Sequence, residues 1–165
     1  MFIVPDPFAR NGAAGAPQRA AIPSAAAWLT GLGIIPFPFL ALLATEAAPW
    51  AADHARMALL VYGAVILSFI GGIRWGFALA PGVYGLAGQG LWPALASGVA
   101  PSLLGWLALL LPATYAEWVL AAGFAAMLVC DCRLIRRGEA PAWYGRLRWP
   151  PTLAAVASLL ASALI

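Results

Sequence analysis

Long stretches without charged residues are the feature that most limits how this chain can fold. Residues 24–45 form a run of 22 without a charge, and about 20 apolar residues in a helix cross the roughly 30 Å hydrocarbon core of a bilayer. Of the 165 residues, 64% are hydrophobic and 9% are charged, whereas a soluble domain carries about 25% charged residues. The sequence therefore predicts an integral membrane protein without a separate soluble domain.

Polar segments and turn residues divide the chain into a short tail and five predicted spans. A polar segment, 46–56, precedes the second span, Pro81 and Gly82 end that span, and Pro112 begins the turn before the fourth. The predicted spans are 24–45, 57–79, 91–111, 115–132 and 149–165. We therefore expect an all-α membrane domain, 24–165, built as a bundle of five transmembrane helices.

The distribution of arginine predicts the orientation of this bundle. All nine basic residues are arginine, and with the N-terminus inside, eight lie in inner segments and only Arg56 lies outside. The positive-inside rule then places the N-terminus inside and the C-terminus outside. Arginine without lysine, together with abundant Ala, Gly and Pro, is typical of a GC-rich genome. We expect a multi-pass protein of a bacterial inner membrane.

The first 23 residues are predicted as an irregular, uncleaved tail. Asp6 and the prolines beside it interrupt the apolar core that a signal peptide needs. The tail nevertheless carries four large apolar residues, which are Phe2, Ile3, Val4 and Phe8. We expect it to dock on the bilayer surface or on a partner.

The second span carries small residues at a spacing of four, namely Ala64, Ser68, Gly72 and Gly76. Residues four apart lie on the same side of a helix. In lipid, a line of small residues lets another backbone approach closely. This line is predicted to pack against a neighbouring helix.

Arg74 lies in the same span, and a charge inside a membrane helix indicates a functional site by default. Because it lies about five residues from the inner end, its side chain is also long enough to reach the headgroups. We favour an anchor formed with Trp75 over a functional charge, with an anionic lipid or a partner's carboxylate as counter-charge.

The arginines near the fourth and fifth spans are expected to contact lipid or a partner: Arg133, Arg136, Arg137, Arg146 and Arg148. The net charge of +3 is therefore interpreted as a topology signal and not as nucleic-acid binding.

Prolines lie in the middle of two predicted spans, at Pro36 and Pro38 in the first and at Pro101 in the third. A proline inside a helix frees a carbonyl group and kinks the helix. Each position marks either close packing or a small cavity.

The residue types that carry catalysis are scarce. The single histidine, His54, lies with Glu46, Asp53 and Glu117 in an outer-face group without metal-site spacing. Cys130 and Cys132 are two apart and point to different sides of a helix, so they are not expected to share a metal. No predicted span has a carboxylate near its middle. We expect no enzyme activity, metal or cofactor.

One stretch resembles a known family. Residues 62–76, YGAVILSFIGGIRWG, are similar to the signature of the transmembrane protein 69-like family, a group of unknown function found in bacteria with eukaryotic relatives. The helix before it, with Gly33 and Pro36, also fits that pattern, and the resemblance covers roughly residues 24–164. It implies a small multi-span inner-membrane protein without an assigned activity, and it supplies no catalytic residues.

Two functions remain open from the sequence. The first is a non-catalytic accessory or assembly subunit of a larger inner-membrane complex, plausibly respiratory or photosynthetic, with other integral membrane subunits as partners. The alternative is a small membrane protein that binds or transports a lipid, a quinone or another apolar ligand. The first is favoured because the chain has little chemistry and a line of small residues suited to close packing.

Overall fold

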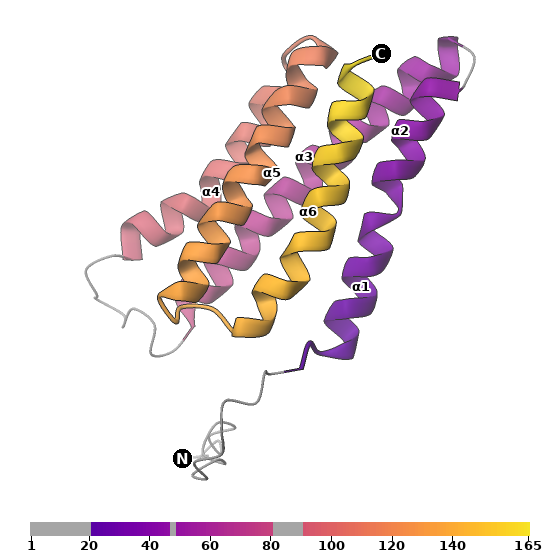
Figure 1. Cartoon of the computed structure of the whole chain (residues 1–165). Helices are drawn as coiled ribbons and strands as arrows, with labels where there is room; N and C mark the ends of the chain where they lie inside the picture. Colours follow the sequence, from indigo (N-terminus) through magenta and orange to yellow (C-terminus); the bar gives the residue numbers. More distant parts are fainter. Residues whose placement is uncertain (1–20, 47–48, 81–90) are drawn as a thin grey trace, which may run out of the picture.

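The computed structural model describes residues 21–46, 49–80 and 91–165, and this part of the chain is helical without strands (Figure 1). The helices are α1 (Ser24–Ile34), α2 (Pro36–Glu46), α3 (Pro49–Leu79), α4 (Leu91–Ala108), α5 (Ala113–Arg136) and α6 (Ala142–Ala163). The predicted docking of Phe2, Ile3, Val4 and Phe8 lies outside the described residues.

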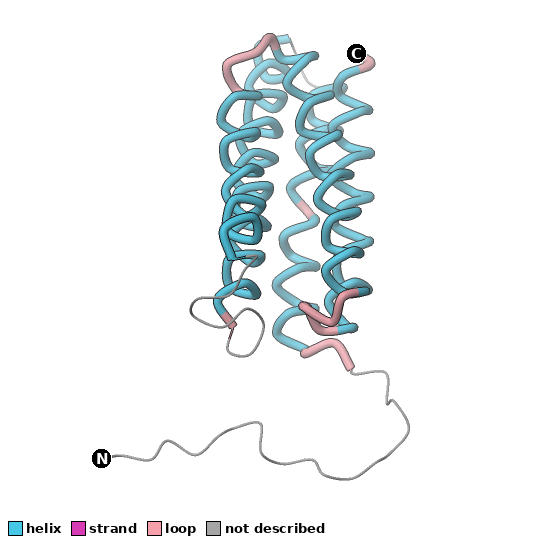
Figure 2. Tube along the Cα trace, turned by 90° about the vertical axis from the view of Figure 1, so that its left-hand side faces the viewer, coloured by secondary structure: helices cyan, strands magenta, loops and turns pink. Residues whose placement is uncertain are grey.

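The helices form one elongated bundle (Figures 1 and 2). α2 continues the direction of α1, and the two pack against α6 while α2 also contacts α3. α3 and α4 pack side by side and run in opposite directions, and α5 and α6 form a second antiparallel pair. The start of α1 and the α5–α6 connection lie at one end of the bundle, which we call the arginine-rich end because Arg136 and Arg137 lie there; the C-terminus lies at the opposite end.

Four segments are long and apolar enough to cross a membrane: Ser24–Thr45, which joins α1 and α2, Trp50–Leu79, Leu91–Ala108 and Ala113–Arg136. The chain is therefore an all-helical, multi-pass membrane protein. α6 is not among these four, because Arg146, Arg148 and two prolines interrupt its apolar sequence.

Two segments predicted as loops are instead helical. α3 begins at Pro49, so most of the polar segment 46–56 belongs to it, and α6 begins at Ala142, well before the predicted 149. In both cases a charged residue that suggested a loop has a partner inside the bundle. Arg56 pairs with Glu117, and Arg148 pairs with Asp131. A paired charge is compatible with a continuous helix.

The prolines of the first span separate α1 from α2 at Ile35. One carbonyl just before this break, that of Gly33, accepts a hydrogen bond of 2.8 Å from the Tyr62 hydroxyl on α3. Phe37 follows the break and is buried edge-on against the rings of Tyr62 and Phe124. The kink is therefore filled by packed aromatic side chains.

The core lies where α2, α3, α5 and α6 meet. Its largest fully buried apolar side chains are Phe37, Phe124, Leu59, Leu67, Ile70, Leu120 and Leu159. α4 packs against α3 through small residues, among them Gly71, Gly98 and Gly105.

Candidate functional site

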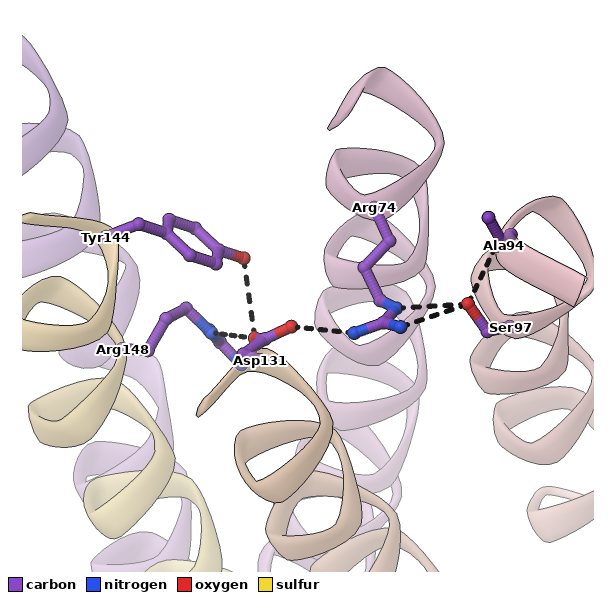
Figure 3. A network of polar contacts seen from close by, with 6 residues as sticks. All are labelled: Arg74, Ala94, Ser97, Asp131, Tyr144 and Arg148. Carbon is purple, nitrogen blue, oxygen red and sulfur yellow. Dashed lines mark hydrogen bonds and ion pairs between the residues drawn. The ribbon is translucent and has the colours of Figure 1, made fainter. Parts of the chain in front are cut away.

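The most unusual feature of the bundle is a buried cluster of charged residues near its arginine-rich end (Figure 3). Asp131 on α5 has no exposed surface (0%) and accepts hydrogen bonds from two arginines. Its Oδ1 lies 3.2 Å from Nη1 of Arg74, and its Oδ2 lies 3.0 Å from Nε of Arg148. One carboxylate thus joins α3 and α6 to α5. We call this group, with the two side chains described next, the Asp131 cluster.

Two uncharged side chains complete the Asp131 cluster. The Tyr144 hydroxyl of α6 lies 3.5 Å from Oδ2 of Asp131. Ser97 on α4 accepts from Nη2 of Arg74 at 3.0 Å and donates to the carbonyl of Ala94 at 2.7 Å. Four helices therefore contribute to a single polar network.

This geometry corrects the interpretation of Arg74 and Arg148 as lipid or partner contacts. Both side chains are more than nine-tenths buried and point into the bundle. Their counter-charge is Asp131 of the same chain, because a buried guanidinium requires a nearby anion or acceptors. Trp75 also bonds within the chain, and its Nε1 donates to the carbonyl of Leu95 at 2.8 Å.

The Asp131 cluster carries more positive than negative charge. Two arginines share one carboxylate, and within the part of the chain that the structure describes Nη2 of Arg148 is buried without a hydrogen-bond partner. The hydroxyl of Thr152, one turn further along α6, is also buried without a hydrogen-bond partner among the described residues.

A second cluster lies toward the opposite end of the same helices, and we call it the Glu117 cluster. Glu117 on α5 also has no exposed surface (0%), and Arg56 of α3 binds both of its oxygens, at 2.8 and 2.6 Å. Ser162 of α6 donates to Glu117 at 2.7 Å, and Thr114 accepts from Arg56 at 3.0 Å. The sequence assigned Glu117 to an ordinary outer surface, and the structure corrects this by burying it.

The two clusters use the same three helices in the same way. In each, a carboxylate of α5 is bound by an arginine of α3 and by a polar residue of α6. Arg56 and Arg74 are eighteen positions apart, which is five whole turns and about 27 Å of helix, so they lie on one face of α3. The spacing of these arginines was a signal for a shared face that the sequence interpretation missed.

The predicted line of small residues is only partly directed at another helix of this chain. Ala64 meets Gly105 of α4, where a Cβ on Gly105 would lie 3.2 Å from the Ala64 Cα, and the Ser68 hydroxyl lies 2.8 Å from that of Ser102. Gly72 and Gly76 are exposed, and no atom among the described residues lies within 4 Å of a Cβ built on either. Within the described part of the chain, Gly72 and Gly76 therefore have no neighbouring helix at close range.

The neighbouring glycine makes the contact instead. A Cβ on Gly71 would collide with the carbonyl oxygen of Gly98, and it would lie 3.5 Å from Pro101. Pro101 is buried within α4 at this contact. The close approach of α3 and α4 thus runs through Gly71, Gly98 and Gly105.

A groove of about 530 Å³ lies between α5 and α6 at the arginine-rich end. Leu128, Val129 and Trp149 are among its apolar lining residues, and Arg136 and Arg146 also line it. Pro36, Pro38 and Pro101 do not line this groove. Arg133 and Arg137 are exposed at the same end without lining it.

The residues weighed as possible metal ligands do not form a metal site within the described part of the chain. Cys130 and Cys132 are free thiols, and among the described residues no three His, Cys, Asp or Glu side chains are grouped to hold a metal ion. His54 is exposed, and its Nδ1 lies 2.6 Å from the carbonyl of Trp50, on its own helix.

Comparison with known proteins places the chain among membrane proteins. Residues 22–164 match the family described as "Protein of unknown function (DUF3429)". "Transmembrane protein 69" of Xenopus tropicalis is 36% identical over 142 residues, covering 85% of this chain and 54% of the relative. The protein of the same name from Mus musculus is 30% identical over 145 residues, covering 87% and 57%. The chain thus spans about half the length of these relatives, and no solved structure matches it.

Proposed function

This chain belongs to the transmembrane protein 69-like (DUF3429) family, and we propose that it is a non-catalytic accessory or assembly subunit of a larger membrane complex. The observation that carries the proposal is the open helix face at Gly72 and Gly76. These glycines lie four apart in an apolar helix, with nothing within 4 Å of a Cβ on either among the described residues. In lipid, such a face gains energy chiefly from the close approach of another helix.

The pairing of charges inside the bundle also supports a structural role. The carboxylates of Asp131 and Glu117 are bound by arginines of the same chain. Between the two clusters the interior is occupied mainly by apolar side chains, among them Leu67, Leu120 and Phe124. A carrier for protons or cations uses carboxylates that exchange partners near the membrane centre. Here the carboxylates lie toward the two ends and tie helices together.

We further propose that α6 is a fifth crossing, with the N-terminus inside, in a bacterial inner membrane. α6 extends over 22 residues beside α5 and ends at the opposite end of the bundle from the start of α1. Its buried arginine is paired with Asp131, which lowers the cost of placing this helix in lipid. The exposed Arg133, Arg136 and Arg137 lie at the end where α1 begins, as the positive-inside rule requires for this orientation.

Purification from the native membrane in mild detergent tests the subunit proposal. We expect the chain to co-purify with other integral membrane proteins at fixed stoichiometry. Gly72→Leu is expected to release it from them, because the added side chain holds the partner helix away. Gly31→Leu on α1 is the matched control, since Gly31 is likewise exposed with no described atom within 4 Å of its Cβ position.

Three outcomes would contradict the proposal. The native protein would purify as a monomer, or as a dimer of itself without other subunits. Alternatively, the Gly31 and Gly72 variants would retain their partners equally, and then the face at Gly72 would not be the contact.

A further inference from the structure

The groove between α5 and α6 combines an apolar floor with a basic rim. Of the nine residues that line it, two are arginines and none is acidic. Its volume of about 530 Å³ lies within the range of ligand-binding pockets. This lining is complementary to a ligand that is apolar over most of its length and negative at one end.

The order of residues along α5 sets the direction of such a ligand. Arg136 is the last residue of α5, at the bundle end, while Leu128 lies eight positions earlier, about 12 Å deeper along the helix. Arg146 approaches the rim from α6, and Trp149 lies one turn further in on the same helix. The charged part of the ligand thus lies at the bundle end and its apolar part extends toward the membrane interior.

We propose that this groove is a binding site for one anionic phospholipid. Its phosphate is bound by the guanidinium groups of Arg136 and Arg146, and an acyl chain lies along Leu128, Val129 and Trp149. Guanidinium groups bind phosphate oxygens with paired, charge-assisted hydrogen bonds. Phospholipid surrounds every membrane protein, and tryptophan is enriched where headgroup and chain join. The site is separate from Gly72 and Gly76 on α3, so it does not depend on the subunit proposal.

Cys132 lies in the groove and provides a direct readout. The chain has two cysteines, so Cys130→Ser leaves Cys132 as the one reactive thiol. The full-length protein is placed in nanodiscs of phosphatidylcholine alone or with phosphatidylglycerol. Maleimide labelling of Cys132 is expected to slow when phosphatidylglycerol is present, and native mass spectrometry is expected to retain one phosphatidylglycerol per chain.

Paired substitutions separate a built site from general surface attraction. Arg136→Gln with Arg146→Gln is expected to weaken phosphatidylglycerol retention about tenfold or more, because charge-assisted hydrogen bonds are lost. Arg133→Gln with Arg137→Gln changes the net charge equally at exposed positions outside the groove, and it is expected to leave retention nearly unchanged. Arg136→Lys with Arg146→Lys keeps both positive charges and is expected to retain much of the binding.

Several results would overturn the proposal. Equal losses in the two glutamine pairs would show attraction to the whole surface and no site. Equal protection of Cys132 by inorganic phosphate would show an anion site without a lipid. The double variant Phe2→Ala with Phe8→Ala provides a further check in phosphatidylcholine alone. Faster labelling of Cys132 in this variant would show that the N-terminal residues occupy the groove. Unchanged labelling in the presence of phosphatidylglycerol would show that the lipid does not enter it.

Discussion

At the scale of single residues, Asp131 is the group on which the arginine-rich end of the bundle depends. Its carboxylate is the anion that both Arg74 and Arg148 contact, and each of these three side chains is more than nine-tenths buried. Removing one member of a buried ion pair leaves the other charge without compensation, which costs more than the pair contributes when intact.

We expect Asp131→Asn to destabilise the protein by about 3–5 kcal/mol, because it leaves two buried guanidinium groups without an anion. Asp53→Asn is the control, since Asp53 is exposed on α3 and a surface change of this kind stays within about 0.5 kcal/mol. Thermal unfolding in detergent measures both variants. Equal melting temperatures for the two would contradict the role assigned to Asp131.

A single hydroxyl group supports the kink between α1 and α2. Tyr62→Phe removes the hydrogen bond to the Gly33 carbonyl and is expected to cost about 1 kcal/mol, the usual net value of such a bond. Tyr115→Phe removes a hydroxyl from an exposed side chain and is expected to change stability little. The same unfolding measurement compares them, and no difference between the variants would show that the Gly33 carbonyl does not need Tyr62.

At the scale of helices, the contact of α3 with α4 shows why a strict four-residue pattern does not predict the packed face. Each step of four residues rotates about 40° beyond a full turn, so the line that begins at Ala64 has rotated about 120° when it reaches Gly76. The observed contacts fall on Ala64, Ser68 and then Gly71, which keeps them facing α4. Alternating steps of four and three are what two helices crossing at a small angle require.

Adjacent glycines on α3 provide a matched test of this contact. Gly71→Ala is expected to destabilise the isolated protein by about 1–3 kcal/mol, because its Cβ meets the Gly98 carbonyl and the helices must move apart. Gly72→Ala is expected to be neutral or to stabilise by up to about 1 kcal/mol, because alanine favours helix and the position is open. Similar stabilities for the two variants would contradict the observed orientation of α3.

The buried charges show the limit of sequence-based prediction at this scale. Helical segments, kinks and the membrane class follow from hydropathy and proline placement within each segment. Arg74 and its counter-charge are separated by 57 positions, so their pairing depends on how distant helices pack. One signal was present: Glu117 and Asp131 lie fourteen positions apart on α5, close to four whole turns and thus on nearly the same face.

At the scale of the whole molecule, the Asp131 and Glu117 clusters link the same helices on either side of one mainly apolar core. α3, α5 and α6 are joined near both ends, and a core of mainly apolar side chains lies between the two clusters. α6 is therefore part of the bundle although its sequence is less apolar than that of the other long helices. Counting hydropathy along α6 treats Arg148 as a charge in lipid, whereas in the folded chain it contacts Asp131.

The position of the C-terminus tests whether α6 crosses the membrane. If it does, the chain crosses five times, and its two ends lie on opposite sides with the C-terminus outside. Alkaline phosphatase fused after Ile165 and expressed in a bacterium is then expected to be active, because this enzyme matures only outside the inner membrane. Fluorescent protein fused at the same position is expected to be dark. With Asp131→Asn the insertion of α6 is expected to become less complete, because Arg148 loses its counter-charge. If instead the phosphatase fusion of the unaltered chain is inactive and the fluorescent fusion is bright, the C-terminus lies inside. That result would rule out a fifth crossing with the N-terminus inside.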